Sequence, residues 1–545
     1  MRSQIASCDS RLLRPRTVRG LGALSIAAVL AAPTFADEFL WIGPAGGLWS
    51  IPAHWAPSLA APPDGSADSA RFASGLLGVL RDRRAVSGIV LEQPGALQIA
   101  NGGRLDVYAG GVLCDGLLRI SDRGELHFVA GAGLPVERTI SGAGTIRLEG
   151  PRADIDADPE IHIVTSATLT ISGQGKILAS AEINGPILAD SPGGVIGLDA
   201  PSLLARAALT ARSGGTLHFN QTAVSMSAGG AVIAEPDGVV LLDGSSFSGG
   251  SIIGAGGLIS TDANVTLDGV SISGSIGVPA ASSLSVVSPV LAQGGGAITL
   301  GGPGPIAGIS EFICFDPLTL SGNGSLVLAP ATTPDGLPIS ARLSIAPGAV
   351  MTLADGYTLA GTGEVAGALR VGQIGLAAAT LDAGSPSVPG RIDVTGALEV
   401  TIAGAVRCTL FGPTEHDIIA AGGPAVLAGE VQIEFGPGYM PTPGDQFLIV
   451  SGAMVQDAGV RLVLPAMPDA QIARILSRPD GLVLAIALCP ADLNADGILD
   501  ADDLGDFINC YFDAPACPRA NFNADAFIDA DDLGDYINAY FAGCV

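Results

Sequence analysis

Short apolar segments separated by glycine-containing turns fill the chain between residues 76 and 386. A Gly-x-Gly step followed by alternating apolar residues recurs at 142–146, 173–177, 322–326 and 361–365. The segment 240–252 also aligns with 265–276 at an offset of about 25 residues. Alternation with a period of two is typical of β-strands, and no 3.6-residue helical period interrupts it here. This region must therefore fold by assembling many short strands.

Strands of this size and spacing predict the coils of a right-handed parallel β-helix, or β-solenoid, in which neighbouring coils bury each other's inner face. About 310 residues at roughly 20 to 29 residues per coil would make roughly a dozen coils. A β-sandwich array is the alternative, but hairpin signals are scarce. The 76 glycines and 5% aromatic content suit small stacked side chains, and 14% charged residues are too few for a disordered chain.

All three tryptophans of the protein, Trp41, Trp49 and Trp55, fall within fifteen residues. Further residues of this segment are Pro62, Pro63, Asp68 and Phe72. The pattern resembles the Gly-rich opening of many bacterial surface β-solenoid proteins. Because repeat arrays need terminal caps, we expect 37–75 to form an N-terminal cap. An aromatic patch that stacks on sugars is the alternative.

The character of the sequence changes over residues 387–487. Strand-like pieces occur at 389–394, 398–402, 416–419 and 428–433, followed by the Gly- and Pro-rich segment 436–447. This arrangement resembles the closing segment of autotransporter passenger solenoids. The resemblance implies a β-structured module that ends the solenoid, and it implies no chemistry.

The N-terminus has the pattern of an export signal. Basic residues precede the apolar run 21–32, and 33–36 then supplies small residues before a cleavage point after Ala36. An N-terminal anchor is the alternative, but the run is short for a span of about 20 residues. We therefore expect a signal peptide at 1–36, no transmembrane span in the mature chain, and a secreted or bacterial cell-surface protein. A net charge of −27 disfavours nucleic-acid binding.

Residues 489–545 contain an internal repeat in which Asp492 corresponds to Asn521, and they hold twelve aspartates and one base, Arg519. A twelve-residue EF-hand-type loop supplies oxygen ligands for Ca²⁺ from positions 1, 3, 5, 7, 9 and 12. In the first copy these positions are Asp492, Asn494, Asp496, Ile498 (through its carbonyl), Asp500 and Asp503. In the second copy they are Asn521, Asn523, Asp525, Phe527 (through its carbonyl), Asp529 and Asp532.

The second loop departs from the first at two positions. Asn521 removes one carboxylate, and Ala526 stands where the first loop has the turn glycine Gly497. A side chain makes a left-handed conformation costly at that position. We expect the second loop to bind calcium more weakly.

A helical pattern follows each loop. Its apolar positions are Leu504, Phe507, Ile508, Tyr511 and Phe512 in the first copy. They are Leu533, Tyr536, Ile537, Tyr540 and Phe541 in the second. Both sets predict an amphipathic helix, and the two helices are expected to pack face to face.

Duplicated loops ending in Asp, each followed by one helix, resemble a type I dockerin. This resemblance implies a small α-helical calcium module and a calcium-dependent, cohesin-like protein partner. In dockerins, loop positions 10 and 11 often carry recognition. Here these positions are Ala501 and Asp502, or Ala530 and Asp531. An acidic position 11 departs from the usual small hydroxyl residues, which leaves an intramolecular cap as the alternative role.

Four of the eight cysteines lie in this module, which in an exported protein suggests two disulfides. Three pairings are open; we favour Cys510–Cys517 together with Cys489–Cys544. The scattered Cys114, Cys314 and Cys408 are predicted to be small core residues.

No sequence motif singles out a catalytic residue. The best acidic cluster is Asp154, Asp156, Asp158 and Glu160, near His162. Strand alternation would place these acids on one face, as an acid/base pair or a cation site, but Pro159 favours a solvated turn. We therefore expect an exported, non-catalytic structural or adhesive surface protein, in possible contact with polysaccharide or the cell surface. The alternative is a carbohydrate-active β-helix enzyme, a polysaccharide lyase or glycoside hydrolase, carried by the dockerin-like module.

Overall fold

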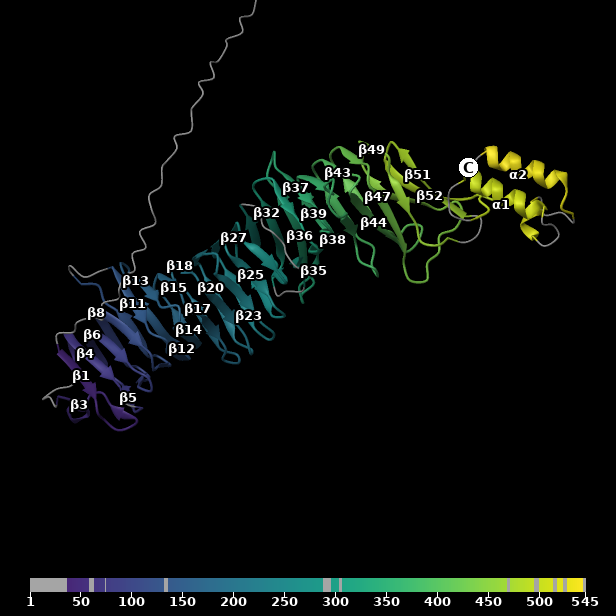
Figure 1. The fold of residues 1–545 in the computed structure, drawn as a ribbon. Coiled ribbons are helices and arrows are strands. Elements are labelled where there is room, and N and C mark those ends of the chain that lie inside the picture. Colours follow the sequence, from purple (N-terminus) through teal and green to yellow (C-terminus); the bar gives the residue numbers. More distant parts are fainter. Residues whose placement is uncertain are drawn as a thin grey trace, which may run out of the picture. The chain divides into compact units, whose positions relative to one another are not determined.

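The computed structural model of the protein describes most of the chain after residue 36. The described residues are 37–57, 63–73, 75–131, 136–287, 296–302, 306–467, 471–494, 499–512, 517–522 and 527–542. Within these ranges the fold is mainly β, and two α-helices lie near the C-terminus (Figure 1). The expected signal peptide lies outside the described residues.

Most strands form three parallel ladders, sheets I, II and III, in which a strand pairs with the strand one coil further along the chain. Several early strands bend through a corner and contribute to two ladders: β4 (Gly65–Phe72), β6 (Arg83–Leu91), β8 (Arg104–Cys114), β12 (Thr145–Ala157) and β14 (Thr170–Ile177). Figure 1 shows successive strands following one another in sequence order along the stack. The parallel β-solenoid predicted from the sequence is therefore confirmed.

Sheet I continues from these bent strands through short strands in register. They are β10 (Glu125–Phe128), β17 (Val195–Leu198), β20 (Thr216–Asn220), β23 (Val239–Asp243), β26 (Leu258–Thr261), β29 (Ser275–Val278), β31 (Ala297–Gly301), β34 (Ser325–Ala329), β38 (Thr358–Gly361), β41 (Ala379–Ala383), β44 (Gly404–Leu410), β47 (Glu430–Phe435) and β50 (Arg461–Val463).

Sheet II begins with β1 (Asp37–Trp41) and runs alongside. Its further strands are β11 (Glu137–Ser141), β13 (His162–Thr165), β15 (Ala181–Ile183), β18 (Ser202–Ala205), β21 (Ala223–Met226), β24 (Ser246–Ser248), β27 (Val265–Asp268), β30 (Ser283–Val286), β32 (Gly308–Cys314), β36 (Pro338–Ile345), β39 (Gly363–Ala366), β42 (Arg391–Val394), β45 (Ile418–Ala421) and β48 (Gln446–Ser451). The parallel pairing crosses residue 386 without interruption, because β39 pairs with β42 and β42 with β45.

Sheet III occurs in two runs. The first comprises β2 (Gly47–Leu48), β5 (Leu77–Leu80), β7 (Ala96–Ile99), β9 (Leu117–Ser121), the start of β12 and β14, β16 (Ile187–Ala189), β19 (Ala208–Ala211), β22 (Ala231–Ala234), β25 (Ser251–Gly254) and β28 (Ser271–Ser273). The second comprises β33 (Leu318–Leu320), β37 (Val350–Leu353), β40 (Ala368–Val371), β43 (Leu398–Val400), β46 (Ala425–Leu427) and β49 (Val455–Asp457).

The remaining elements interrupt or end the ladders. Two short strands pair antiparallel with a neighbour: β3 (Trp55–Ala56) with β1, and β35 (Ala331–Thr332) with β36. After the last coil, β51 (Gln471–Arg478) and β52 (Gly481–Leu488) form a hairpin, and β52 pairs antiparallel with β48. The helical elements are η1 (Pro52–His54), α1 (Ala501–Phe512), η2 (Pro518–Ala520) and α2 (Ala530–Ala542).

The core is a ladder of inward aliphatic side chains that the register stacks one above another. In sheet I it consists of Leu217, Val240, Ile259, Ile276, Ile298, Leu326, Leu359, Leu381, Val406, Val431 and, half-buried at the end, Leu462. The residues between them point outward, as the period of two requires. Each coil thus presents an apolar inner face that only its neighbours bury.

The length of a coil varies. Ile259 pairs with Ile276 on the next coil, whereas Ser325 pairs with Thr358, so the second of these coils is almost twice as long as the first. The similarity between 240–252 and 265–276 in the sequence therefore does not mark the coil period. It aligns β23, in sheet I, with β27, in sheet II.

Glycine occupies corners where the chain passes from one sheet to the next. Gly361, the last residue of β38, has a φ of 104°. A Cβ at this position would lie 2.0 Å from the carbonyl oxygen of Leu328 on the preceding coil. The Gly-x-Gly steps recognised in the sequence therefore mark positions where coils approach too closely for a side chain.

The tryptophan cluster is buried in the first coil. Trp55 packs edge-on against Trp41 and Trp49, and all three rings contact Phe72, with ring centroids 4.7–5.8 Å apart. The indole nitrogens of Trp49 and Trp55 donate to the carbonyls of Pro63 and Trp49. All three indoles are at most 1% exposed, so they cannot serve as a surface for stacking on sugars.

Among the described residues, no helix has the length and apolar character needed to cross a membrane. The three scattered cysteines are free and buried, as predicted. Burial raises the pKa of the Cys114 thiol to about 12 and that of Cys314 to about 11, so both remain neutral thiols.

The stacked core predicts a large difference between two matched substitutions. Phe219 is buried and packs edge-on against Phe247 of the next coil, with centroids 5.1 Å apart, whereas Phe315 is exposed. We expect Phe219→Ala to cost about 3–5 kcal/mol locally, because it leaves a cavity in the core. Phe315→Ala should change stability by less than about 0.5 kcal/mol. Hydrogen exchange of β20 and β23 measures the effect of Phe219→Ala, and that of β32 measures the effect of Phe315→Ala. Equal loss of local protection in the two variants would contradict the assigned core.

Candidate functional site

The C-terminal module is built around two helices that come from equivalent positions of the sequence repeat. Phe507 of α1 stacks on Tyr536 of α2, with ring centroids 3.8 Å apart and planes within 6°. These two residues are equivalent in the repeat, so the two copies meet through the same position. The helices lie side by side in Figure 1. Phe522 packs edge-on against both rings.

Tyr536 also ties α2 to the segment that precedes the first loop. Its hydroxyl donates a hydrogen bond of 3.0 Å to the carbonyl of Ala491. Burial raises the pKa of this hydroxyl, and the negative charge of Asp503 raises it further. Tyr536 therefore stays neutral and keeps donating throughout the physiological pH range.

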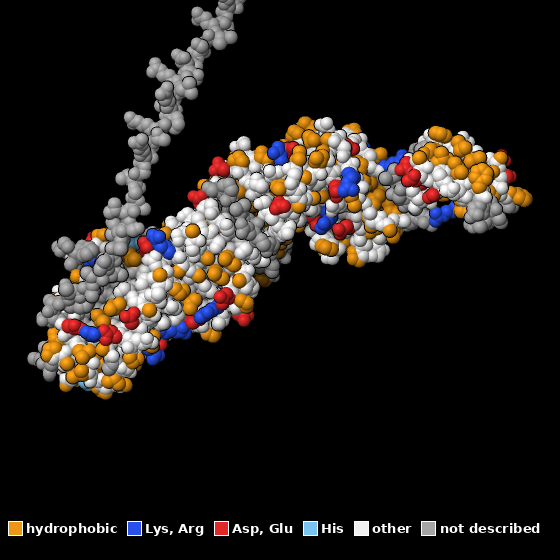
Figure 2. Space-filling model, in the orientation of Figure 1, with side chains coloured by type: hydrophobic (Ala, Val, Ile, Leu, Met, Phe, Trp, Pro, Cys, Tyr) orange, Lys and Arg blue, Asp and Glu red, His pale blue; other side chains and the backbone are white. Residues whose placement is uncertain are grey.

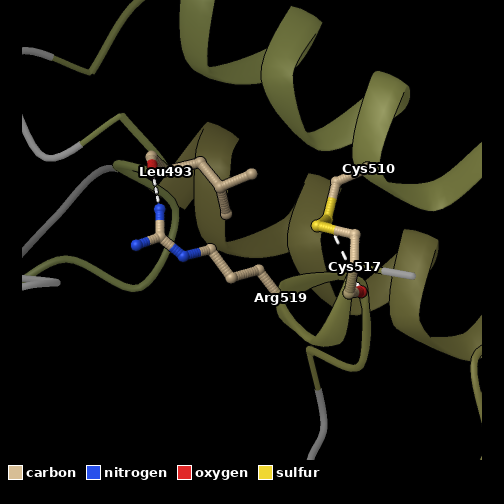
Figure 3. Close-up of a disulfide and its surroundings, with 4 residues drawn as sticks. All are labelled: Leu493, Cys510, Cys517 and Arg519. Carbon is tan, nitrogen blue, oxygen red and sulfur yellow. Dashed lines mark hydrogen bonds between the residues drawn. A yellow bond between two sulfur atoms is a disulfide. The ribbon is translucent and has the colours of Figure 1, made fainter. Parts of the chain in front are cut away.

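A disulfide between Cys510 and Cys517 joins the end of α1 to η2 (Figure 3). This bond confirms one of the two predicted pairings. Cys489 is also disulfide-bonded, while its predicted partner Cys544 lies outside the described residues. Arg519, the one base of the module, donates from Nη1 to the Leu493 carbonyl at 2.7 Å and so holds η2 against the first loop (Figure 3).

Asp503, at position 12 of the first loop, is fully buried at the start of α1. Its Oδ1 accepts from the backbone N–H groups of Leu493 at 2.8 Å and Asn494 at 3.3 Å. Its Oδ2 accepts from the N–H of Asp500 at 2.9 Å. The carboxylate therefore connects the beginning of the loop with its end, and it does so through charge-assisted hydrogen bonds.

Asp500 and Asp503 also form a reciprocal cap on α1. Asp500 precedes the helix, and its Oδ1 accepts from the N–H of Asp502 at 2.8 Å. Asp529 and Asp532 repeat this arrangement on α2, with hydrogen bonds of 2.9 Å in both directions. This is the geometry of a capping box, which satisfies N–H groups that the first turn of a helix leaves unpaired. The aspartate at position 12 of each loop therefore helps to cap its helix, in addition to its predicted role as a calcium ligand.

The described part of the chain includes eight of the twelve predicted ligands. Asp492, Asp503 and Asp532 are buried, Asn521 is half-buried, and Asn494, Asp500, Phe527 and Asp529 are exposed. Asp496, Ile498, Asn523 and Asp525 lie outside the described residues, as do Gly497 and Ala526. The structure therefore brings the beginning and the end of the first loop together at the start of α1, and it places the end of the second loop at the start of α2.

The donors present suit a hard cation. Asp492 and Asp503 are both buried carboxylates, and Asp503 lies against the peptide that follows Asp492. Burying two carboxylates in one place is costly unless positive charge compensates them. The predicted set offers oxygen alone, which is the ligand type that Ca²⁺ takes. These residues would hold a calcium ion that tightens the loop against the helix.

The apolar stripe predicted on each helix is only partly buried. Phe507 and Tyr536 lie in the core, but Ile508, Phe512, Ile537 and Phe541 are exposed. The prediction was wrong for these four, because two short helices that meet at one aromatic pair leave the flanking positions uncovered. Ala501, Asp502, Ala530 and Asp531, the positions expected to carry recognition, are exposed as well.

The acidic cluster noticed in the sequence lies on the outer face of sheet I. Asp154 and Asp156 point outward on either side of buried Ile155, as alternation predicts. The neighbouring histidine is His127 of β10, which pairs in register with Asp156. His162 lies instead in β13 of sheet II, paired with Glu137. The sequence predicted His162 as the neighbour of the acidic cluster because it is close along the chain. The histidine that lies beside the cluster is His127, which comes from the preceding coil.

Comparison with known proteins adds little to this geometry. No protein-family model and no curated protein matches the chain. Among solved structures, it is similar to one described as the TibC-catalyzed hyper-glycosylated TibA55-350 fragment. That match has 11% sequence identity and a TM-score of 0.22, and it covers 71% of this chain and 100% of the other. A TM-score this low carries no argument, so the fold rests on the strand pairing itself.

The difference between the loops predicts opposite effects of two reciprocal substitutions at position 1. Asp492→Asn should weaken calcium binding at the first loop about tenfold, because it removes one carboxylate from the ligand set. Asn521→Asp should strengthen binding at the second loop by a similar factor. Both changes leave the capping hydrogen bonds of Asp503 and Asp532 intact. Calorimetric titration of the chain without residues 1–36 measures the two affinities.

Asp502→Asn is the matched control for this experiment. Asp502 is exposed, lies at a loop position that supplies no ligand, and carries the same charge. Its substitution should leave both affinities within about twofold, since exposed charges interact weakly in solvent. Equal weakening by Asp502→Asn and Asp492→Asn would show a diffuse charge effect and contradict a loop site.

The disulfide predicts a stability difference confined to the module. Replacing both Cys510 and Cys517 by Ala should cost the module about 2–3 kcal/mol, because the unfolded chain regains the freedom of a short loop. Hydrogen exchange should report faster opening of α1 and unchanged protection of β20. Unchanged protection of α1 would show that the bond does not restrain the helix.

Proposed function

We propose that the chain is an exported, non-catalytic structural or adhesive surface protein whose calcium-dependent C-terminal module attaches it to a protein partner. One observation carries this proposal: both helices of the module carry an exposed phenylalanine in their last turn. Phe512 is 80% exposed and Phe541 is 79% exposed, and they occupy equivalent positions of the repeat. Figure 2 shows hydrophobic side chains exposed over the module.

Exposed aromatic side chains in duplicate are favourable anchors for a partner. Aromatic residues are enriched in the centres of protein interfaces, where they fill pockets on the other surface. The flanking Ile508 and Ile537 enlarge each apolar surface. A cohesin-like protein with an apolar pocket would fit each of these surfaces.

Charge further defines the partner. Asp502 and Asp506 are exposed on α1, and Asp531 and Asp535 are exposed at the equivalent positions of α2. A partner with basic residues around its pocket would complement this rim and associate faster. The aspartate at position 11 therefore favours a partner with basic residues around its pocket. Ordinary dockerins have small hydroxyl residues at this position instead.

The solenoid fits the role of a surface that is displayed. In Figure 2 the charged side chains lie in small groups of mixed sign, and much of the visible face is uncharged. Outward hydroxyl residues stack in register along sheet II, where Ser225 pairs with Ser248 and Ser246 with Thr266. Hydroxyl groups offer both donors and acceptors to polysaccharide or to another cell-surface component.

The double substitution Phe512→Ser and Phe541→Ser tests attachment. Envelope proteins from the source cell would be passed over the immobilised chain in calcium and in EGTA. We expect a defined partner that is retained in calcium, released by EGTA, and lost with the double variant. The expected loss is about 100-fold in affinity, as for removal of aromatic anchors at an interface.

Phe315→Ser provides the control, because this exposed phenylalanine lies on the solenoid. It should leave the calcium-dependent interaction unchanged. Retention that persists in EGTA, or that the double variant does not reduce, would rule out attachment through the module.

A further inference from the structure

A buried histidine on the outer face of sheet I lies among carboxylates from two adjacent coils. The register aligns Asp106 of β8, His127 of β10 and Asp156 of β12 in one row. The neighbouring row aligns Arg104, Glu125 and Asp154. Residues far apart in the sequence thus form one compact polar cluster.

The two ring nitrogens of His127 have different surroundings. Nε2 lies 3.1 Å from Oδ1 of Asp158, whose Oδ2 accepts from the N–H of Ala130 at 2.6 Å. Nδ1 is buried and makes no hydrogen bond. It lies 3.4 Å from Oε1 of Glu125 and 3.6 Å from Oδ2 of Asp156. The residue is 7% exposed, so Nδ1 lies beneath the outer surface of the sheet.

These separations suit atoms that share a metal ion. In a tetrahedral site, metal–ligand bonds of about 2.0–2.2 Å place the ligands about 3.3–3.6 Å apart. The ligand atoms of Glu125, His127 and Asp156 all lie within 4.8 Å of one another. The contact with Asp158 matches the usual second contact of a metal-binding histidine, in which a carboxylate accepts the other ring N–H and fixes the ring.

The charges around the cluster favour a cation. The acids on this face are Asp106, Glu125, Asp154, Asp156 and Asp158. Arg83 and Arg104 compensate only part of this charge, through Asp106 and Glu125. A cavity of about 410 Å³, lined in part by His127, Asp156, Asp158 and Ser180, leaves room for water beside them.

We propose that Nδ1 of His127 and the carboxylates of Glu125 and Asp156 bind a divalent transition-metal ion such as Zn²⁺. Asp158 orients the ring through Nε2, and water from the cavity completes the coordination. One imidazole with two carboxylates suits Zn²⁺ better than Ca²⁺, which takes oxygen ligands. The ion would link the coil that contains β10 to the coil that contains β12.

Titration of the tag-free chain with Zn²⁺ tests this site, with saturating calcium present to occupy the C-terminal loops. We expect one zinc ion with a micromolar or tighter Kd. His127→Gln and Asp156→Asn should each weaken binding by at least about 100-fold, because each removes a ligand. Asp158→Asn should weaken it by about 10- to 100-fold, as loss of an orienting partner does. Co²⁺ in place of Zn²⁺ should give visible absorption that His127→Gln abolishes.

His218→Gln is the matched control. His218 lies on the outer face of the same sheet with one carboxylate, Asp243, 3.7 Å from its Nε2. Its substitution should leave the zinc affinity and the cobalt spectrum unchanged. Absence of saturable zinc binding, or equal affinity in wild type and His127→Gln, would overturn the site and leave His127 as an ion-pairing residue. Asp156→Asn keeps the histidine, so it distinguishes lost ligation from failure of the His127 variant to fold.

Discussion

Parallel pairing of each coil with the next is the interaction on which the described solenoid depends. A single coil has three short strands and an apolar inner face that it cannot cover by itself. Stacking supplies both the backbone hydrogen bonds and the burial, as the aliphatic ladder from Leu217 to Leu462 illustrates. Stability is therefore shared between neighbours, and loop length can vary freely as long as the inward residues stay in register.

This freedom explains what could and could not be predicted from the sequence. Alternation identified strands, and the glycine steps identified corners, because both patterns are local. Coil length is not local, since the coil that starts at Ser325 is almost twice as long as the one that starts at Ile259. Residues on adjacent coils therefore could not be matched by spacing. His127 was missed for this reason, although Glu125-x-His127 and Asp154-x-Asp156 have the same alternation in register.

In the C-terminal repeat, the positions of the loops and helices could be predicted, but the burial of the helices could not. Its constant offset was evident in the sequence, and both predicted helices are present, although each begins before its loop ends, at Ala501 and at Ala530. The extent of helix burial was harder to predict, because periodicity reports which residues share a face and not how wide a surface the partner covers. Phe507 and Tyr536 cover each other, and the covered area ends before Phe512 and Phe541. The exposed residues that this surface leaves uncovered are the main support for an external partner; they are Ile508, Phe512, Ile537 and Phe541.

The hairpin after the last coil affects how copies of this chain behave at high concentration. A stack of parallel coils exposes unpaired backbone groups at its end, which another copy could extend into a fibre. Here β52 pairs antiparallel with β48 and β51 pairs antiparallel with β52, so the hairpin covers the free edge of β48 and interrupts the parallel ladder of sheet II. A strand of a second chain therefore cannot pair with β48 in the parallel register that joins successive coils. The hairpin thereby opposes end-to-end association of copies of this chain through sheet II.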